Sequence, residues 1–169
     1  MAKLSWVIFC ERSVVDSATN SLSLMNIVEE IHPPAPTKEQ LKEAAGRTIG
    51  AGMQCAVVSY WGRSHANKQE RPSKVMLRLI DPDNAKQIEA IQELDFGNAT
   101  RARLVANLQA IPAGREGTYV WRVYLRQKSR WKVVGEISYE LSYLSSPAEL
   151  KRLMKTARRN AAKSPGQLR

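Results

Sequence analysis

Strict alternation of apolar and polar residues is the feature that most constrains how this chain folds. In GTYVWRVYLRQ (117–127), large apolar side chains stand at every second position, at Tyr119, Trp121, Val123 and Leu125. A helix would scatter these side chains around its axis, whereas a strand places them on one face. The segments SKVMLRLIDP (73–82) and VGEISYELSY (134–143) show the same period. The pattern predicts β-strands with one buried face.

The same criterion predicts about eight strands, separated by turns rich in Asp, Asn, Gly and Pro. They lie near residues 4–14, 21–32, 53–62, 73–81, 86–96, 101–111, 117–127 and 130–143. Successive strands at hairpin spacing, each with one apolar face, indicate antiparallel sheets. A chain of 169 residues is long enough for two such sheets to pack face to face. We therefore expect an all-β, antiparallel β-sandwich.

Two segments depart from this pattern and predict helices. The connector 33–52 contains TKEQLKEAAG, in which Thr37 and Gln40 form a capping box and Gly46 a C-terminal stop. After Leu144, the segment SPAE (146–149) is a helix start, and apolar residues then recur at helical spacing. We expect a β-sandwich domain over 1–144, followed by an amphipathic basic helix and tail over 145–169.

Charge is distributed unevenly between these two parts. The chain carries a formal net charge of +10, and its last 25 residues hold seven Lys or Arg against one Glu. The body is therefore close to neutral and the appendage is basic. Six cations cover one side of the predicted C-terminal helix, as candidates for binding an anionic partner: Lys151, Arg152, Lys155, Arg158, Arg159 and Lys163. The alternative is that the apolar side of the helix docks on the sandwich and its charges are only solvated.

The residues available for catalysis are few. Cys10 and Cys55 both lie within alternating strands, where a free cysteine behaves as a small buried hydrophobe. The two histidines, His32 and His65, lie in no recognisable nucleophile motif, and the chain has no G-x-S-x-G. We expect no catalytic residue and therefore no enzyme.

Metal and cofactor motifs are equally sparse. Glu29, Glu30 and His32 offer fewer well-spaced ligands than a zinc site needs. The segment DPDN (81–84) suits a hairpin turn better than a calcium loop, because calcium takes six to eight oxygen ligands. Neither G-x-G-x-x-G nor G-x-x-x-x-G-K-[ST] occurs. We expect no bound cofactor or metal.

Five segments of the chain can be compared together with known families: FCERSVVDSATNSLSLMNIVEEI, VVSYWGR, LRLIDPDN, EGTYVWRVYLR and WKVVGEISYEL. As a set they resemble a bacterial family of small β-sandwich proteins of unknown function. The shared pattern is an N-terminal Cys-Glu strand, an LSLxNIxEEI strand and an LRLxDPD hairpin, and it spans roughly residues 6–143. The resemblance implies the fold and a bacterial, cytoplasmic origin. It carries no catalytic residue.

Three functional hypotheses follow. The first is a non-enzymatic β-sandwich that binds another protein, with the basic helix as an accessory element. The second is binding of nucleic acid or an anionic surface through that helix. The third is a small-ligand or sugar-binding module that uses outward aromatic residues such as Tyr60 or Tyr124. Outward apolar residues such as Met76 and Ile80 also allow a homo-oligomer. No apolar run reaches the ~20 residues of a membrane span, so we expect a cytoplasmic protein.

Overall fold

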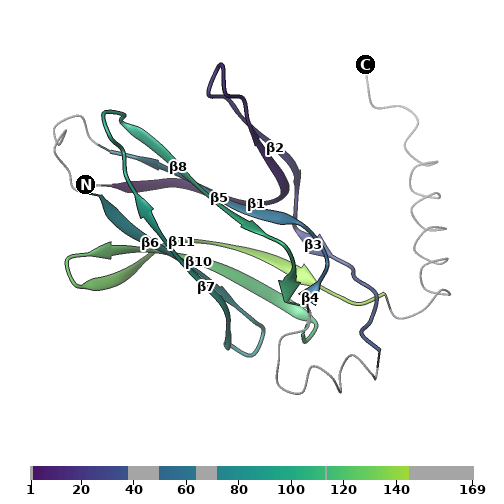
Figure 1. Ribbon diagram of the computed structural model, residues 1–169. Coiled ribbons are helices and arrows are strands. Elements are labelled where there is room, and N and C mark those ends of the chain that lie inside the picture. Colours follow the sequence, from purple (N-terminus) through teal and green to yellow (C-terminus); the bar gives the residue numbers. More distant parts are fainter. Residues whose placement is uncertain (1, 38–49, 64–71, 113, 145–169) are drawn as a thin grey trace, which may run out of the picture.

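Two β-sheets packed face to face form the body of the protein (Figure 1). The computed structural model describes residues 2–37, 50–63, 72–112 and 114–144. Within them lie eleven strands: β1 (Lys3–Val15), β2 (Leu22–Ile27), β3 (Glu30–Ile31), β4 (Gly50–Ala51), β5 (Cys55–Gly62), β6 (Ser73–Ile80), β7 (Lys86–Leu94), β8 (Arg101–Leu108), β9 (Ile111–Pro112), β10 (Gly117–Gln127) and β11 (Arg130–Leu141). The predicted all-β sandwich is confirmed.

The four-stranded sheet has the order β2-β1-β5-β8 and the five-stranded sheet the order β3-β11-β10-β6-β7. Neighbouring strands are antiparallel, except that β3 pairs with β11 in parallel. A third, two-stranded sheet joins β4 to β9. The first strand is apolar on both faces, with Trp6, Ile8 and Cys10 on one and Val7 and Phe9 on the other, so the sequence favours an inner position for it. It lies between β2 and β5.

Two of the predicted strands are each divided in the structure. The segment predicted at 21–32 contributes β2 to the four-stranded sheet and β3 to the five-stranded sheet. The segment predicted at 101–111 becomes β8 of the four-stranded sheet and the short β9, which pairs with β4 in the two-stranded sheet. The predicted helices at 37–46 and after Ser145 lie outside the described residues.

The core between the sheets is rich in aromatic side chains. Phe9 of β1 lies against Trp121 and Tyr139 of the opposite sheet, with ring centroids 6.3 Å and 5.0 Å away. Tyr139 also stacks on Tyr119 at 5.4 Å. All four side chains are 1% exposed or less. These are the residues that the alternating pattern places on the inner faces.

Close contact between the sheets also requires a glycine. Gly135 of β11 lies beneath Leu4 of β1, and a Cβ added at this position would overlap the Leu4 Cδ2 methyl. Any larger residue would push β1 away from β11 or force Leu4 into another rotamer. Gly135 therefore leaves the space that the Leu4 methyl occupies between the two sheets.

Candidate interaction surface

The outer face of the five-stranded sheet carries one row of apolar side chains across four strands. The strand register aligns Val133 with Tyr124, Tyr124 with Met76, and Met76 with Ile91. The two ends of this apolar row are open, since Val133 is 46% and Ile91 56% exposed, whereas Met76 in the middle is buried. The row is therefore already packed at its centre and offers apolar surface at both ends.

A second, charged row runs beside the first. Register places Arg122 opposite Glu136 on one side and opposite Arg78 on the other, with Glu89 beyond Arg78. Arg78 Nη2 lies 2.6 Å from Glu89 Oε2, and Arg122 Nε lies 3.6 Å from Glu136 Oε2. Each arginine thus has a glutamate, so the charged row carries no net charge.

Electrostatic contacts join the two rows. The Arg78 guanidinium lies 5.2 Å from the centroid of the Tyr124 ring, in cation–π geometry. Its hydrogen bond to Glu89 holds the pKa of that carboxyl below its usual range, so Glu89 stays ionised at neutral pH. Arg78 is therefore held by a carboxylate and a ring at once.

The outer face of the four-stranded sheet is different, because the β1–β2 hairpin folds back over it (Figure 1). Cys10, Ala56 and Val58 are fully buried there, and Leu22 and Leu24 of β2 pack on them. The hairpin tip reaches β8, where Arg103 Nη1 donates to the Asn20 carbonyl at 3.1 Å and Nη2 donates to the Asn20 side chain. This face is closed by a segment of the chain itself.

The aromatic residues suggested as a sugar platform lie on different sheets. Tyr60 of β5 stacks on Trp6 with ring centroids 5.1 Å apart, on the outer face of the four-stranded sheet. Tyr124 lies on the outer face of the five-stranded sheet, beneath Arg78. The two therefore do not form one platform.

Both thiols are buried, as the alternation predicts. Cys10 Sγ donates to the Ala56 carbonyl and Cys55 Sγ to the Met53 carbonyl, each at 3.7 Å. Burial raises the pKa of Cys10, and it raises the pKa of Cys55 to about 12. Both groups are protonated thiols at neutral pH, and a protonated thiol is a poor nucleophile.

His32 belongs to a hydrogen-bonded chain that includes a residue not considered from sequence. Its Nδ1 lies 2.7 Å from Ser142 Oγ and its Nε2 3.2 Å from Glu30 Oε2. The chain is open to water, since the His32 and Glu30 side chains are 48% and 67% exposed. These contacts tie β3 to the end of β11. Ser142 lies 110 residues from His32, and no local signal joins them.

Asp81 of the DPDN segment, like Asp16 and Asp95 elsewhere, accepts hydrogen bonds within its own turn. Asp81 Oδ1 accepts from the backbone N–H groups of Asp83 and Ala85, at 2.9 and 2.7 Å. Asp16 Oδ1 accepts from two N–H groups of its own turn, and Asp95 Oδ1 accepts from Gly97. The turn interpretation of DPDN is confirmed. Across the ranges the structure describes, no three His, Cys, Asp or Glu residues cluster as metal ligands would.

The six candidate cations at Lys151, Arg152, Lys155, Arg158, Arg159 and Lys163 lie outside the described residues, as does His65. Within the described ranges, no helix is long and apolar enough to cross a membrane.

Comparisons with known proteins add little to this picture. No protein-family model and no curated protein matches the chain. Among solved structures, an immunoglobulin-like protein from Pseudomonas aeruginosa is similar at a TM-score of 0.37 and 14% identity, over 84% of this chain and 97% of that one. A glycosyl hydrolase family 2 member from Bacteroides cellulosilyticus is similar at a TM-score of 0.38 and 17% identity. That match covers 54% of this chain but only 12% of the hydrolase. Likenesses this weak carry no functional argument.

Proposed function

We propose that this protein is a non-enzymatic binding module that contacts another protein through the outer face of its five-stranded sheet. The observation that carries the proposal is the apolar row Val133–Tyr124–Met76–Ile91, aligned by register across four strands and exposed at both ends. Interface centres are enriched in aromatic residues, Met and Arg, and the middle of the two rows is of these types: Tyr124, Met76, Arg78 and Arg122.

Burial of this row would supply a useful part of a binding free energy. Fully burying an aliphatic side chain that was exposed contributes roughly 1.5–3 kcal/mol. Ile91 and Val133 are about half exposed, so each can contribute part of that amount. The strands hold Tyr124 and Met76 in place before binding, so little side-chain entropy is lost there.

The charges on this face favour a protein over a polyanion. Arg78 and Arg122 are each paired with a glutamate of the same sheet. A nucleic acid would have to compete with those carboxylates, whereas an apolar protein surface with a mixed polar rim would not.

The chemistry of the titratable groups supports a binding role without catalysis. The two cysteines are buried and protonated at neutral pH. The chain Ser142–His32–Glu30 is exposed to water, which screens its charge and competes for its hydrogen bonds. The two free buried cysteines also support a reducing, cytoplasmic compartment.

Glutamate substitution at the exposed ends of the apolar row tests the proposal. We expect Ile91→Glu and Val133→Glu each to abolish capture of a partner by the full-length, immobilised protein, because a carboxylate desolvated against an apolar partner surface is strongly unfavourable. The matched control is Val15→Glu, an exposed valine (43%) on the β1–β2 hairpin. Captured proteins are compared by mass spectrometry, and thermal unfolding shows that each variant is folded.

The outcomes separate the alternatives. Loss with both row variants and retention with Val15→Glu support the proposal. Identical captured proteins for all four chains would contradict it. Sedimentation of the pure protein over a range of concentrations shows whether the partner is a second copy of this chain.

A further inference from the structure

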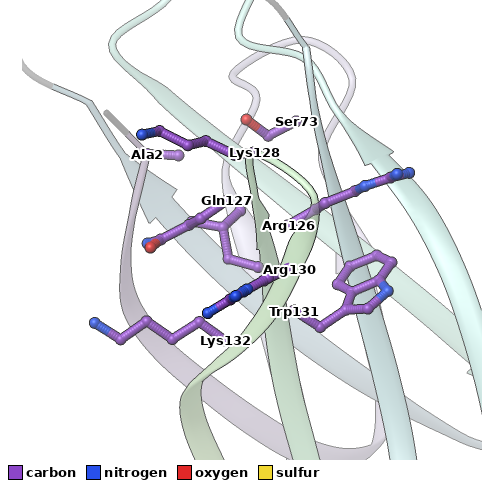
Figure 2. A pocket seen from close by; sticks show the side chains of 9 residues that line it. Ala2, Ser73, Arg126, Gln127, Lys128, Arg130, Trp131 and Lys132 are labelled. Atoms are coloured by element: carbon purple, nitrogen blue, oxygen red, sulfur yellow. The ribbon is translucent and has the colours of Figure 1, made fainter.

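A basic cleft opens at the end of the sandwich where β10 turns into β11. Its volume is about 560 Å³. Figure 2 shows the side chains that line it. Figure 1 shows the β10–β11 hairpin and the N-terminus at this same end of the molecule. The lining residues are Ala2, Ser73, Leu125, Arg126, Gln127, Lys128, Arg130, Trp131 and Lys132.

Strand alternation explains why charged side chains enter the cleft. Leu125 is a core residue, 2% exposed, and register places Lys132 directly opposite it. The next pair on the same side is Gln127 with Arg130. The hairpin extends beyond the last core layer, so positions that would face a core carry cations instead. Figure 2 shows Gln127, Arg130 and Lys132 on the Ala2 side of the hairpin, with Trp131 and Arg126 on the other.

The positive charge in this cleft is not neutralised within the described chain. The described residues of the lining include four cations and no carboxylate. Arg126 stacks on Trp131, with its guanidinium 6.0 Å from the ring centroid. Among the described residues, Lys128, Arg130 and Lys132 form no ion pair, in contrast to Arg78 and Arg122 on the sheet face. Like charges gathered in this way repel one another, and a bound anion would relieve the repulsion.

We propose that this cleft binds a small molecule that carries two or more linked phosphate groups. Three exposed, unpaired cations match the charge of linked phosphates better than the single charge of a carboxylate. A guanidinium binds two phosphate oxygens at once, and the lysines add point charges. The Gln127 amide and the Ser73 hydroxyl supply further donors. The volume lies within the range of small-ligand sites, and Leu125 provides an apolar floor.

The backbone at Lys128 supports a role for its charge. Lys128 has φ 55°, at the first position of the two-residue turn between Gln127 and Arg130. Glycine and asparagine adopt this left-handed conformation readily, whereas a lysine is disfavoured there. A lysine at position 128 therefore destabilises the turn but adds a positive charge to the cleft.

Titration calorimetry at low salt tests the proposal by measuring binding of sodium tripolyphosphate to the full chain. Inorganic phosphate serves as the comparison ligand. We expect tripolyphosphate to bind more tightly than phosphate. Arg130→Gln and Lys132→Gln should each weaken tripolyphosphate binding roughly ten-fold or more, the effect of losing a charge-assisted hydrogen bond. Arg12→Gln is the matched control, because it removes one exposed charge far along β1 from Ala2.

Lys128→Gly separates binding from folding. We expect this variant to unfold at a higher temperature than the wild type and to bind tripolyphosphate more weakly. The proposal is overturned if the wild type does not bind tripolyphosphate, or if the cleft variants bind it as tightly as Arg12→Gln does. The second result would place polyanion binding elsewhere on the chain. Neither result bears on the apolar row.

Discussion

Neighbouring residues of one strand can have quite different surroundings, as Cys55 and Ala56 of β5 show. Cys10 pairs with Ala56, and both lie beneath the β1–β2 hairpin on the outer face of the four-stranded sheet. Cys55 is adjacent to Ala56 and therefore points the other way, into the core between the sheets. The sheet separates the two thiols, so they cannot form a disulfide without unfolding.

The raised pKa of Cys55 makes the stability of the protein depend on alkaline pH. The folded thiol has a pKa of about 12, against about 9 for an exposed one, so between these values the unfolded chain loses a proton that the folded chain keeps. Stability is unaffected below pH 9 and falls as the pH rises, by up to about 1.4 kcal/mol per unit for this one group.

The measurement is urea unfolding of the wild type and Cys55→Ala between pH 8 and 11. We expect a shallower decline for the variant. Tyr119, Tyr139 and Tyr143 also have pKa values raised by burial, so both chains lose stability at the alkaline end. Parallel curves would show that Cys55 ionises in the folded protein as it does in water.

At the scale of elements, the long strand β1 takes part in two pairings, one with β5 in the sheet and one with β2 in the β1–β2 hairpin. Residues Lys3–Cys10 of β1 pair with β5, and Cys10–Val15 pair with β2. Asn26, with φ 52°, interrupts the regular geometry of β2. The sequence predicts that the first strand lies inside a sheet and not at a free edge, and this is confirmed. The β1–β2 hairpin covers the outer face of β1 because its tip contacts β8, a strand that is distant in sequence.

Removal of the Arg103 side chain should loosen this hairpin. Arg103 is the described link between the tip at Asn20 and β8. We expect Arg103→Ala to increase the rate at which a thiol reagent labels Cys10 in the native protein by about five-fold, since an exposed hydrogen bond contributes roughly 1 kcal/mol. Arg101→Ala on the same strand is the control, and peptide mass spectrometry distinguishes Cys10 from Cys55. Equal labelling rates for the two variants would mean that apolar packing alone holds the hairpin.

At the scale of the whole molecule, the core that joins the two sheets is formed by residues from β1 to β11. Leu144 closes the described chain, with its N–H donating to the Pro33 carbonyl at 3.1 Å. We expect a chain that ends at Leu144 to unfold cooperatively, with a Tm within about 5 °C of the full-length protein. A change of 1 kcal/mol shifts the Tm of a chain of this size by roughly 2–4 °C.

Calorimetry on the two chains measures this. Loss of a cooperative transition in the shorter chain would show that residues 145–169 belong to the core. Retention would support the division into a sandwich and a basic appendage, and would allow the cations at 151–163 to be tested for binding separately from the cleft.

Local pattern alone determined most of the strands and their faces. The strand at 117–127 was predicted with the bounds it has in the structure, and its inward residues are those of the core. Alternation is a property of adjacent residues, so it identifies a strand and its two sides without identifying a partner. For that reason the segment 21–32 read as one strand, although the chain passes from one sheet to the other near Val28.

The tertiary structure decided everything that depends on which strands meet. The apolar row needs the register of four strands, and the cleft needs Ala2 beside a hairpin more than 120 residues later in the chain. In the sequence, Lys128, Arg130 and Lys132 are ordinary cations of a hairpin. Register places Arg130 and Lys132 on the inner side of a hairpin that extends past the end of the core, and Lys128 lies in the turn beside them. All three side chains are exposed, and no carboxylate of the described chain pairs with them.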